Sequence, residues 1–362
     1  IEGAKFQEEA YHLLITKKGI LLEATTPKGM YWGRQTLEQL KTTKNKKIYL
    51  PQCEITDWPA FRIRGFMHDV GRSFIPVEEL KREISLLSRY KINVFHWHLT
   101  ENQAWRLECK KYPQLNAPEN MEREKGKYYT LEEARQLVEF CKQHQVLLIP
   151  EIDMPGHSAA FERTFKTDMQ SEKGTQILKD IIDEVCATFD VPYLHIGTDE
   201  VQFTNPDFVP MMVKYIRDKG KKVISYNPGW NYKPGEIDMT QLWSYRGKAQ
   251  KGIPAIDCRY HYANHFDTYA DLVAMFNSRI YNQPEGSDDL AGCIVAFWND
   301  RYIDNTPQLL AENNFYPYML TLAERAWRGG GNCYFDGKGT LLWEDEPKQL
   351  AAFKEFEDRL LW

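Results

Sequence analysis

The sequence lacks several features that would assign it to a special class of protein. No run of apolar residues approaches the roughly 20 that a membrane-spanning helix needs. Positive charge is not in excess, because 46 Lys and Arg stand against 51 Asp and Glu, for a net charge of −5. Binding to nucleic-acid phosphates usually requires a basic face. We therefore expect no membrane span and no nucleic-acid partner.

Closely spaced cysteines are also absent. The seven cysteines are dispersed, without a Cys-x-x-Cys pair, at positions 53, 109, 141, 186, 258, 293 and 333. An odd and scattered set is typical of neither a disulfide framework nor a zinc–cysteine site. We expect most of these side chains to be buried as small apolar groups.

Aromatic residues, in contrast, are abundant. The chain of 362 residues contains 10 Trp, 20 Tyr and 18 Phe. Stacked Trp rings are a common way to hold the apolar face of a sugar, since the large ring contributes much contact area. The length favours one large domain with a smaller one beside it.

The first 60 residues read as a small, partial α+β domain. Residues 11–16 and 20–24 alternate as two strands around Lys18-Gly19, which predicts a hairpin. An amphipathic helix is expected near residues 31–40. The lysine-rich run at 41–47 is interpreted as a solvated face and linker.

Residues 61–362 predict an α/β fold, a (β/α)8 TIM barrel. Short apolar runs alternate there with helical patterns, which is typical of parallel strands joined by crossover helices. A doubly wound sheet would usually have a glycine-rich turn after its first strand, and Asp69-Val70-Gly71-Arg72 is a poor one. The expected strands are 63–70, 93–100, 146–153, 193–200, 222–227, 239–245, 253–260 and 293–300. The expected helices include 77–90, 131–144, 174–189, 210–219 and 307–327.

Polar and aromatic residues gather where these strands end. The carboxyl ends of barrel strands are where barrel enzymes build their active sites. A nearly complete ring of such residues is hard to explain by chance, and it predicts an enzyme. The candidate residues are Asp69, Arg72, His98, Glu101, Asp153, His157, Asp199, Glu200, Trp230, Trp243, Tyr262, Trp298 and Asp300.

The adjacent acids Asp199 and Glu200 are the sharpest of these signals. Neighbouring side chains on a regular strand point to opposite faces, but both can reach one pocket where the strand turns into a loop. Two close carboxyl groups allow one to stay charged while the other holds a proton near neutral pH. The pair therefore predicts acid–base chemistry.

The motif His195-x-Gly197-x-Asp199-Glu200 resembles the catalytic signature of glycoside hydrolase family 20, the β-N-acetylhexosaminidases, in its bacterial type. Further blocks resemble the family in the right order along nearly the whole chain. These blocks are residues 31–40 (YWGRQTLEQL), 64–72 (RGFMHDVGR), 93–100 (NVFHWHLT), 150–157 (PEIDMPGH) and 298–300 (WND).

The resemblance implies an exo-acting, retaining enzyme that needs no protein nucleophile, because the 2-acetamido oxygen of the substrate attacks the anomeric carbon. Asp199 and Glu200 would be the catalytic residues. Glu200 would protonate the leaving oxygen and then deprotonate water. Asp199 would accept a hydrogen bond from the acetamido N–H, and Tyr262 would donate one to the acetamido oxygen.

The other implied residues bind the substrate. Arg72 would hold ring hydroxyls with its fixed fork of donors, and Asp153 and His157 would support Glu200. Trp230, Trp243 and Trp298 would enclose the acetamido group and the sugar faces. The implied partner is a glycan ending in N-acetylhexosamine; no cofactor or metal is implied, and we expect export to the periplasm or outside, with the signal not present in this chain.

The chain departs from the family pattern at four places. Thr198 stands where Gly is usual, and Glu101-Asn102 replaces a pair of acids after His-Trp-His. Tyr262-Ala263-Asn264 stands for Tyr-x-Asp, and Asp300 stands for the Glu that contacts the 4- and 6-hydroxyls. The catalytic pair is intact, so we expect the changes to alter contacts with hydroxyls.

Two other functions remain open from the sequence. The spacing His96-x-His98 fits a metal-dependent barrel hydrolase, which would need further ligands, and His195 is the clear candidate. A non-catalytic glycan-binding barrel would keep its Trp residues but would be expected to have lost Asp199 or Glu200. Both acids are present, which favours the hexosaminidase.

Overall fold

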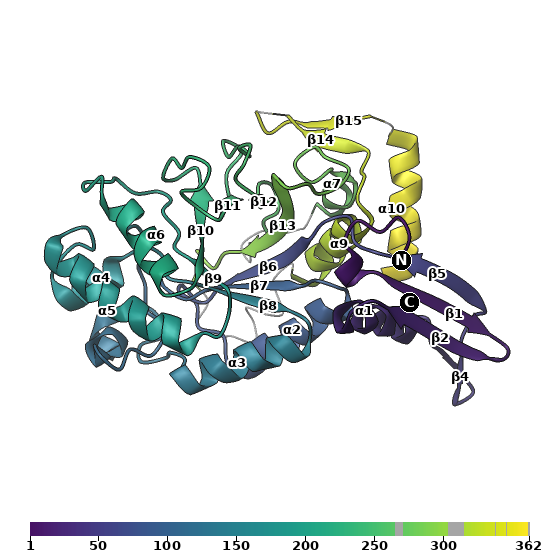
Figure 1. The fold of residues 1–362 in the computed structure, drawn as a ribbon, viewed down its shortest axis with the longest axis horizontal. Coiled ribbons are helices and arrows are strands. Elements are labelled where there is room, and N and C mark those ends of the chain that lie inside the picture. Colours follow the sequence, from purple (N-terminus) through teal and green to yellow (C-terminus); the bar gives the residue numbers. More distant parts are fainter. Residues whose placement is uncertain (265–270, 303–314, 337, 345, 361–362) are drawn as a thin grey trace.

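The computed structural model describes residues 1–264, 271–302, 315–336, 338–344 and 346–360. Its centre is a closed barrel of parallel strands (Figure 1), in which β13 pairs with β6 to complete the ring. The barrel strands in chain order are β6 (Ile63–Asp69), β7 (Val94–His98), β8 (Leu147–Glu151), β9 (Tyr193–His195), β10 (Lys222–Asn227), β11 (Met239–Leu242), β12 (Ala255–Asp257) and β13 (Leu290–Phe297).

The closed ring confirms the predicted (β/α)8 barrel and excludes the doubly wound sheet. Each predicted strand is present, but several are shorter than predicted. The strand expected at 193–200 ends at His195, and the backbone then takes φ values of +65° at Gly197, +82° at Thr198 and +49° at Glu200. Positive φ is incompatible with an extended strand, so the motif lies in a tight loop.

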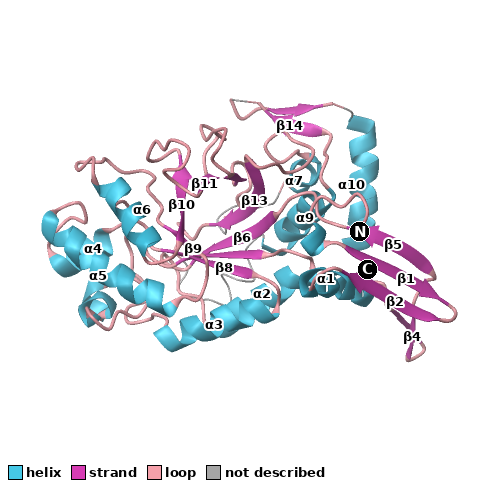
Figure 2. Ribbon diagram, viewed as in Figure 1, coloured by secondary structure: helices cyan, strands magenta, loops and turns pink. Residues whose placement is uncertain are grey.

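Helices lie around the outside of the barrel (Figure 2). The α3 helix begins where Thr130 and Glu133 form a capping box, as the sequence pattern of such a start requires. The first part of the helix expected at 307–327 falls outside the described residues. The helices are α2 (Val77–Arg89), α3 (Leu131–Gln143), α4 (Ala159–Phe165), α5 (Glu172–Thr188), α6 (Phe208–Asp218), α7 (Leu272–Asn277), α9 (Phe315–Arg328) and α10 (Glu346–Leu360).

Two barrel connections have no helix. Residues 228–238 join β10 to β11, and residues 243–254 join β11 to β12, both as irregular segments. Short 3-10 helices occur at η1 (Gln7–Glu9), η2 (Pro113–Asn116) and η3 (Pro118–Asn120), and a hairpin of β14 (Cys333–Phe335) and β15 (Leu341–Trp343) precedes α10.

The N-terminal segment forms a three-stranded antiparallel sheet in the order β2-β1-β5, with α1 against it. The predicted hairpin is confirmed. The helix begins earlier than predicted, because Thr26 caps it and Pro27 fits the first helical turn. The elements are β1 (Tyr11–Thr16), β2 (Gly19–Ala24), α1 (Pro27–Gln39) and β5 (Cys53–Asp57).

The lysine-rich run was predicted to be a solvated linker, and this interpretation is wrong in one respect. Its residues form a small hairpin of β3 (Thr42–Lys44) and β4 (Lys47–Tyr49), which the run of polar Thr and Lys residues did not reveal. Every residue of the two strands is exposed, so the solvated face is confirmed.

A buried ion pair joins the small sheet to the amino end of the barrel. Arg64, the second residue of β6, contacts Glu9 at 2.6 Å, and both side chains are fully buried. The indole N–H of Trp32 donates to the same carboxylate at 2.7 Å. The small domain therefore packs at the end of the barrel opposite to the carboxyl ends of the strands.

The interior of the barrel changes character along its axis. Apolar side chains such as Val94 and Ile149 fill the amino half. Because side chains on one strand face alternate with a period of two, the next inward positions on β7 and β8 are His96 and Glu151. The polar layer therefore begins inside the barrel, below the strand ends. Within the described part of the chain, none of the helices is both long enough and apolar enough to pass through a bilayer.

Candidate active site

An ordered chain of three side chains lies at the carboxyl ends of β8 and β9. His157 Nδ1 lies 2.8 Å from Asp153 Oδ2, and His157 Nε2 lies 3.4 Å from Glu200 Oε2. Asp153 is buried, whereas 57% of the Glu200 side chain is exposed. The chain thus runs from the protein interior to a carboxyl group that a ligand can reach.

The charge on His157 is strongly favoured. Burial opposes this charge, but the hydrogen bond and attraction of Asp153 outweigh burial and raise the pKa of His157 to about 10. Burial also raises the pKa of Asp153. At neutral pH an imidazolium therefore faces Glu200.

Asp199 occupies a different environment from Glu200. Its carboxyl group is buried, with Oδ1 3.8 Å from His157 Nδ1 and without a hydrogen-bond partner among the described residues. Burial, and then repulsion by Asp153, raise the pKa of Asp199 well above its usual range. The two adjacent acids therefore lie in different environments, Asp199 buried and Glu200 accessible.

The loop that carries both acids is fixed by its neighbours. Thr198 Oγ1 lies 2.5 Å from Ser225 Oγ, and Ser225 donates to the carbonyl of Gly197 at 3.0 Å. Positive φ is unfavourable for a β-branched residue, so these bonds explain how Thr198 is held where the family usually has Gly. The departure leaves the positions of Asp199 and Glu200 in the loop intact.

Three of the predicted aromatic residues form one connected wall. The Tyr262 hydroxyl donates to the Trp243 carbonyl at 2.5 Å, and its ring lies 6.5 Å from that of Trp298. The Trp243 indole N–H donates to the carbonyl of Pro228 at 2.6 Å. Burial raises the pKa of Tyr262, so its hydroxyl stays a donor.

Arg72 connects three carboxylates beside this wall. Its guanidinium contacts Asp69 at 2.9 Å, Glu101 at 2.6 Å and Asp300 at 3.6 Å, and it lies over the Trp298 ring at 5.3 Å. Asp69 and Glu101 are buried, whereas 53% of the Asp300 side chain is exposed. The structure therefore brings Arg72, Glu101 and Asp300 together.

Trp230 lies apart from these residues. Its ring packs edge-to-face on Phe203 at 4.9 Å and lines a groove against α6, with Val213 and Arg217. The segment 228–238 contains no helix, so it passes along the flank of the barrel and carries Trp230 there. A role for Trp230 in enclosing the acetamido group stays a prediction.

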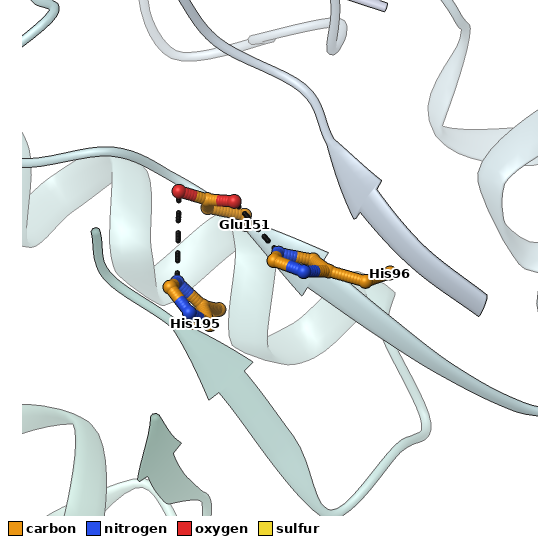
Figure 3. A group of neighbouring side chains, drawn as sticks. All are labelled: His96, Glu151 and His195. Carbon is orange, nitrogen blue, oxygen red and sulfur yellow. Dashed lines mark ion pairs between the residues drawn. The ribbon is translucent and has the colours of Figure 1, made fainter. Parts of the chain in front are cut away.

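A buried carboxylate that the sequence reasoning did not select lies beneath the site. Glu151 lies 2.6 Å from His96, 2.8 Å from His98 and 3.5 Å from His195, and Figure 3 shows His96 and His195 on either side of it. Tyr226 donates to Glu151 at 3.1 Å. The available signal was the two-residue spacing between Glu151 and Asp153 at the end of one strand.

The cluster of His96, Glu151 and His195 has the ligand types of a metal site. Donors held tetrahedrally at about 2.0–2.1 Å from zinc would lie about 3.3 Å from one another. The distance of 2.6 Å between His96 Nε2 and Glu151 Oε2 is much shorter than this, and His96 Nε2 makes no hydrogen bond among the described residues. Burial lowers the pKa of His195 to about 3, so its ring is neutral. The geometry therefore favours a cluster of close histidine–carboxylate contacts over a zinc site.

Comparison with known proteins identifies the family of this chain. The family model described as glycosyl hydrolase family 20, catalytic domain, matches residues 61–170 and 161–237, and the model for domain 2 of the same family matches residues 2–58. The chain is similar to the β-hexosaminidase of Porphyromonas gingivalis, with 36% identity over 249 residues covering 60% of this chain and 32% of the relative. It is also similar to the β-hexosaminidase of Vibrio furnissii, with 36% identity over 230 residues covering 54% of this chain and 38% of the relative.

The structural likeness extends over almost the whole chain. The crystal structure of a β-N-acetylhexosaminidase from Bacteroides fragilis matches with a TM-score of 0.78 and 26% identity, covering 97% of this chain and 82% of that one. The chain spans about a third of the length of the two curated relatives. The family models, the barrel and the preceding sheet together show that this chain belongs to glycoside hydrolase family 20.

Proposed function

We propose that the protein is an exo-acting, retaining β-N-acetylhexosaminidase that removes terminal β-linked N-acetylglucosamine or N-acetylgalactosamine from glycans by substrate-assisted catalysis. The observation that carries the proposal is the series of contacts from Asp153 through His157 to the accessible Glu200, with Asp199 buried beside it. The relatives named β-hexosaminidases support the same activity.

Glu200 acts first as a general acid. It protonates the glycosidic oxygen while the substrate's own acetamido oxygen forms a bond to the anomeric carbon, and the aglycone leaves with the proton. Glu200 then removes a proton from the water that opens the cyclic intermediate. The nearby His157 imidazolium stabilises the carboxylate that exists between the two steps.

Asp199 stabilises the cyclic intermediate. Its unpartnered buried oxygen is suited to accept a hydrogen bond from the acetamido N–H. Positive charge that develops on the acetamido group favours the ionised form of Asp199, despite the raised pKa of that carboxyl in the free protein. The pocket is acid-rich, which stabilises a cationic intermediate.

The aromatic wall and the arginine explain a preference for chain ends. Trp243, Tyr262 and Trp298 would enclose the acetamido group and one sugar face. The Tyr262 hydroxyl, which donates to the Trp243 carbonyl in the free protein, would turn from that carbonyl to donate to the acetamido oxygen. Arg72 and Asp300 would bind the hydroxyls at the far end of the sugar, where an internal residue of a glycan would have to continue. That closed end makes the enzyme exo-acting.

The direct test compares the release of nitrophenol from the β-N-acetylglucosaminide, its galacto epimer, the 6-sulfated sugar and the plain β-glucoside. Hydrolysis of the acetamido sugars with an inert glucoside is expected, because the 2-acetamido group is the nucleophile. A thiazoline analogue of the cyclised intermediate should also inhibit well. Efficient hydrolysis of the glucoside would contradict substrate assistance, and loss of activity in excess EDTA would support the metal-dependent alternative.

A further inference from the structure

His98 lies at the centre of the polar layer, where it faces two carboxylates from different parts of the site. Its Nδ1 lies 2.8 Å from Glu151 Oε2, and its Nε2 lies 3.7 Å from Glu101 Oε1. Only 1% of His98 is exposed. Neither ring nitrogen makes a hydrogen bond among the described residues, but each lies within ion-pair distance of a carboxylate oxygen, and only the imidazolium form is attracted to both as a cation.

Each of the two carboxylates belongs to a different half of the pocket. Glu101 contacts Arg72 at 2.6 Å, on the side that faces Asp300. Glu151 lies with Asp153 on the other side, and atoms of His98, Glu151 and Asp153 lie within 4.8 Å of one another. The His98 ring also meets the Trp298 ring edge-to-face at 5.0 Å.

We propose that His98 is a positioning residue: a buried imidazolium that holds Glu101 and Glu151 at the same time, and so couples the hydroxyl-binding half of the pocket to the Asp153–His157 half. Its charge favours the ionised form of Glu151, and its edge fixes the Trp298 ring. The inference rests on the proposed function for its catalytic consequence, although the ionisation of His98 does not depend on it.

The surrounding charges support this assignment. Burial opposes a charge on His98, but Glu151 and Glu101 outweigh burial and raise its pKa well above the usual range. The attraction of His98 opposes the effect of burial on Glu151, whose pKa lies well below its usual value. Charged or titratable groups on the neighbouring strands act on His98 or respond to it. They are Asp69 at the end of β6, Arg72 after β6, Glu101 after β7, Glu151 at the end of β8, Asp153 after β8, and His195 at the end of β9.

His96 provides a matched control on the same strand. It also contacts Glu151, at 2.6 Å, and is equally buried. Among the described ion pairs of His96, only one of its ring nitrogens faces a carboxylate. The substitutions His98→Gln and His96→Gln therefore each remove an imidazole ring from Glu151, but only His98→Gln also removes the contact with Glu101.

The first experiment examines the unsubstituted protein and needs no activity. The nine histidines are labelled with ¹⁵N, and the ring signals are assigned by comparison with His98→Gln or, if that variant does not fold, His98→Asn. His98 should show two protonated nitrogens throughout the range of about pH 5–8, where an ordinary histidine loses its charge. A neutral His98 ring in this range would overturn the proposal.

The second experiment compares the pH dependence of kcat/KM for the two variants. Loss of a neighbouring cation raises a carboxyl pKa by about 1–3 units, and a protonated Asp153 no longer has the negative charge that attracts the His157 imidazolium. The acidic limb of His98→Gln should therefore move to higher pH by about that amount, with the largest loss of rate at low pH, while His96→Gln keeps the original limb. Equal loss at every pH, or equal shifts in both variants, would mean a merely structural role. If the unsubstituted protein cleaves no N-acetylhexosaminide, the proposed function fails, yet the ring signals still decide the state of His98.

Discussion

Gly197 lies against Asp153 so closely that a Cβ atom on Gly197 would come within 1.8 Å of Asp153 Oδ1. The loop that carries the two adjacent acids is thus packed directly on the carboxylate that orients His157. Glycine is needed at this position for a second reason, because a φ of +65° disfavours any residue with a Cβ. The position of the loop that carries Asp199 and Glu200 therefore depends on the position of Asp153.

This packing predicts that Gly197→Ala damages both stability and activity. The clash and the positive φ together should lower the free energy of unfolding by more than the ~1 kcal/mol typical of backbone strain at a single glycine. Urea unfolding and kcat/KM measure the two effects. Gly220→Ala is the control, since Gly220 has a φ of +80° but nothing within 4 Å of its Cβ position. If the two variants were equally stable, the contact with Asp153 would not constrain the loop.

The exposed Glu200 predicts a loss that depends on the leaving group. General acid catalysis is typically worth ~10²–10⁴-fold, so Glu200→Gln should lose about that factor in kcat/KM on a natural disaccharide. Substrates with very acidic leaving groups should be less affected in the first step, because they leave without protonation. Wild-type rates on the disaccharide would show that Glu200 is not the acid.

Asp300 predicts relaxed recognition of the 4- and 6-hydroxyls. Asp is one methylene shorter than the Glu that the family usually has, which leaves room for a bridging water or a larger 6-substituent. We expect some tolerance of the galacto epimer or of 6-substituted N-acetylglucosamine. Changes of this size in a pocket usually alter discrimination by ~1–3 kcal/mol without abolishing activity.

The measurement compares Asp300 with Asp300→Glu on the gluco, galacto and 6-substituted sugars. The variant should prefer the gluco sugar more strongly. Glu285→Asp is a control for an exposed acid away from the site, since Glu285 pairs with Lys5. Identical preference ratios for Asp300 and Asp300→Glu would show that this carboxylate does not contact the hydroxyls.

The buried pair of Glu9 and Arg64 predicts a pH-dependent attachment of the small domain. Burial raises the pKa of Glu9, but Arg64 and Lys28 outweigh burial and lower it below 4.5. The stabilisation is therefore fully present above the unfolded-state value and is lost as the pH falls through the lower folded-state value. Breaking a buried pair costs about 3–5 kcal/mol, so Glu9→Gln should lose most of this amount at neutral pH.

Urea unfolding of the wild type and Glu9→Gln, at neutral pH and at successively lower pH, tests the pair. The difference between them should shrink as the pH falls. Glu23→Gln serves as a control, because Glu23 is exposed and contacts only His12 among its described ion pairs. A difference that stays constant with pH would rule out ionised Glu9 as the source of the stabilisation.

Much of the fold could be predicted because buried parallel strands are continuous apolar runs. The run at 222–227 coincides with β10, since Lys222 and Asn227 lie at its ends. The strand predicted at 193–200 is longer than β9, because the apolar pattern does not reveal the φ of +65° at Gly197. Similarly, the start of α1 at Pro27 depends on a cap and not on hydrophobic spacing.

Site residues at the ends of strands could be predicted from the sequence, whereas those inside the barrel or on irregular segments were harder to place. The contact of Arg72 with Asp300 joins the two ends of the barrel sequence, β6 and β13, and follows from ring closure. Glu151 was not selected, because its two-residue spacing from Asp153 places it on the inward face but does not show whether it lies inside the barrel or at its mouth. The position of Trp230 depends on the path of a segment without helix, which local spacing does not determine.

Two barrel connections lack helices, so the strands that carry the pocket residues are not equally supported by packed helices. Asp153, His157 and Glu200 follow strands whose connections contain α3, α5 and α6, whereas Trp243 follows β11, which irregular segments connect on both sides. Fewer packed helices mean a lower free energy of local opening. Amide hydrogens of β11 should therefore exchange with solvent faster than those of β7 and β8. We therefore expect Trp243 to adjust to the sugar that the pocket receives more readily than the residues of the proton-transferring half.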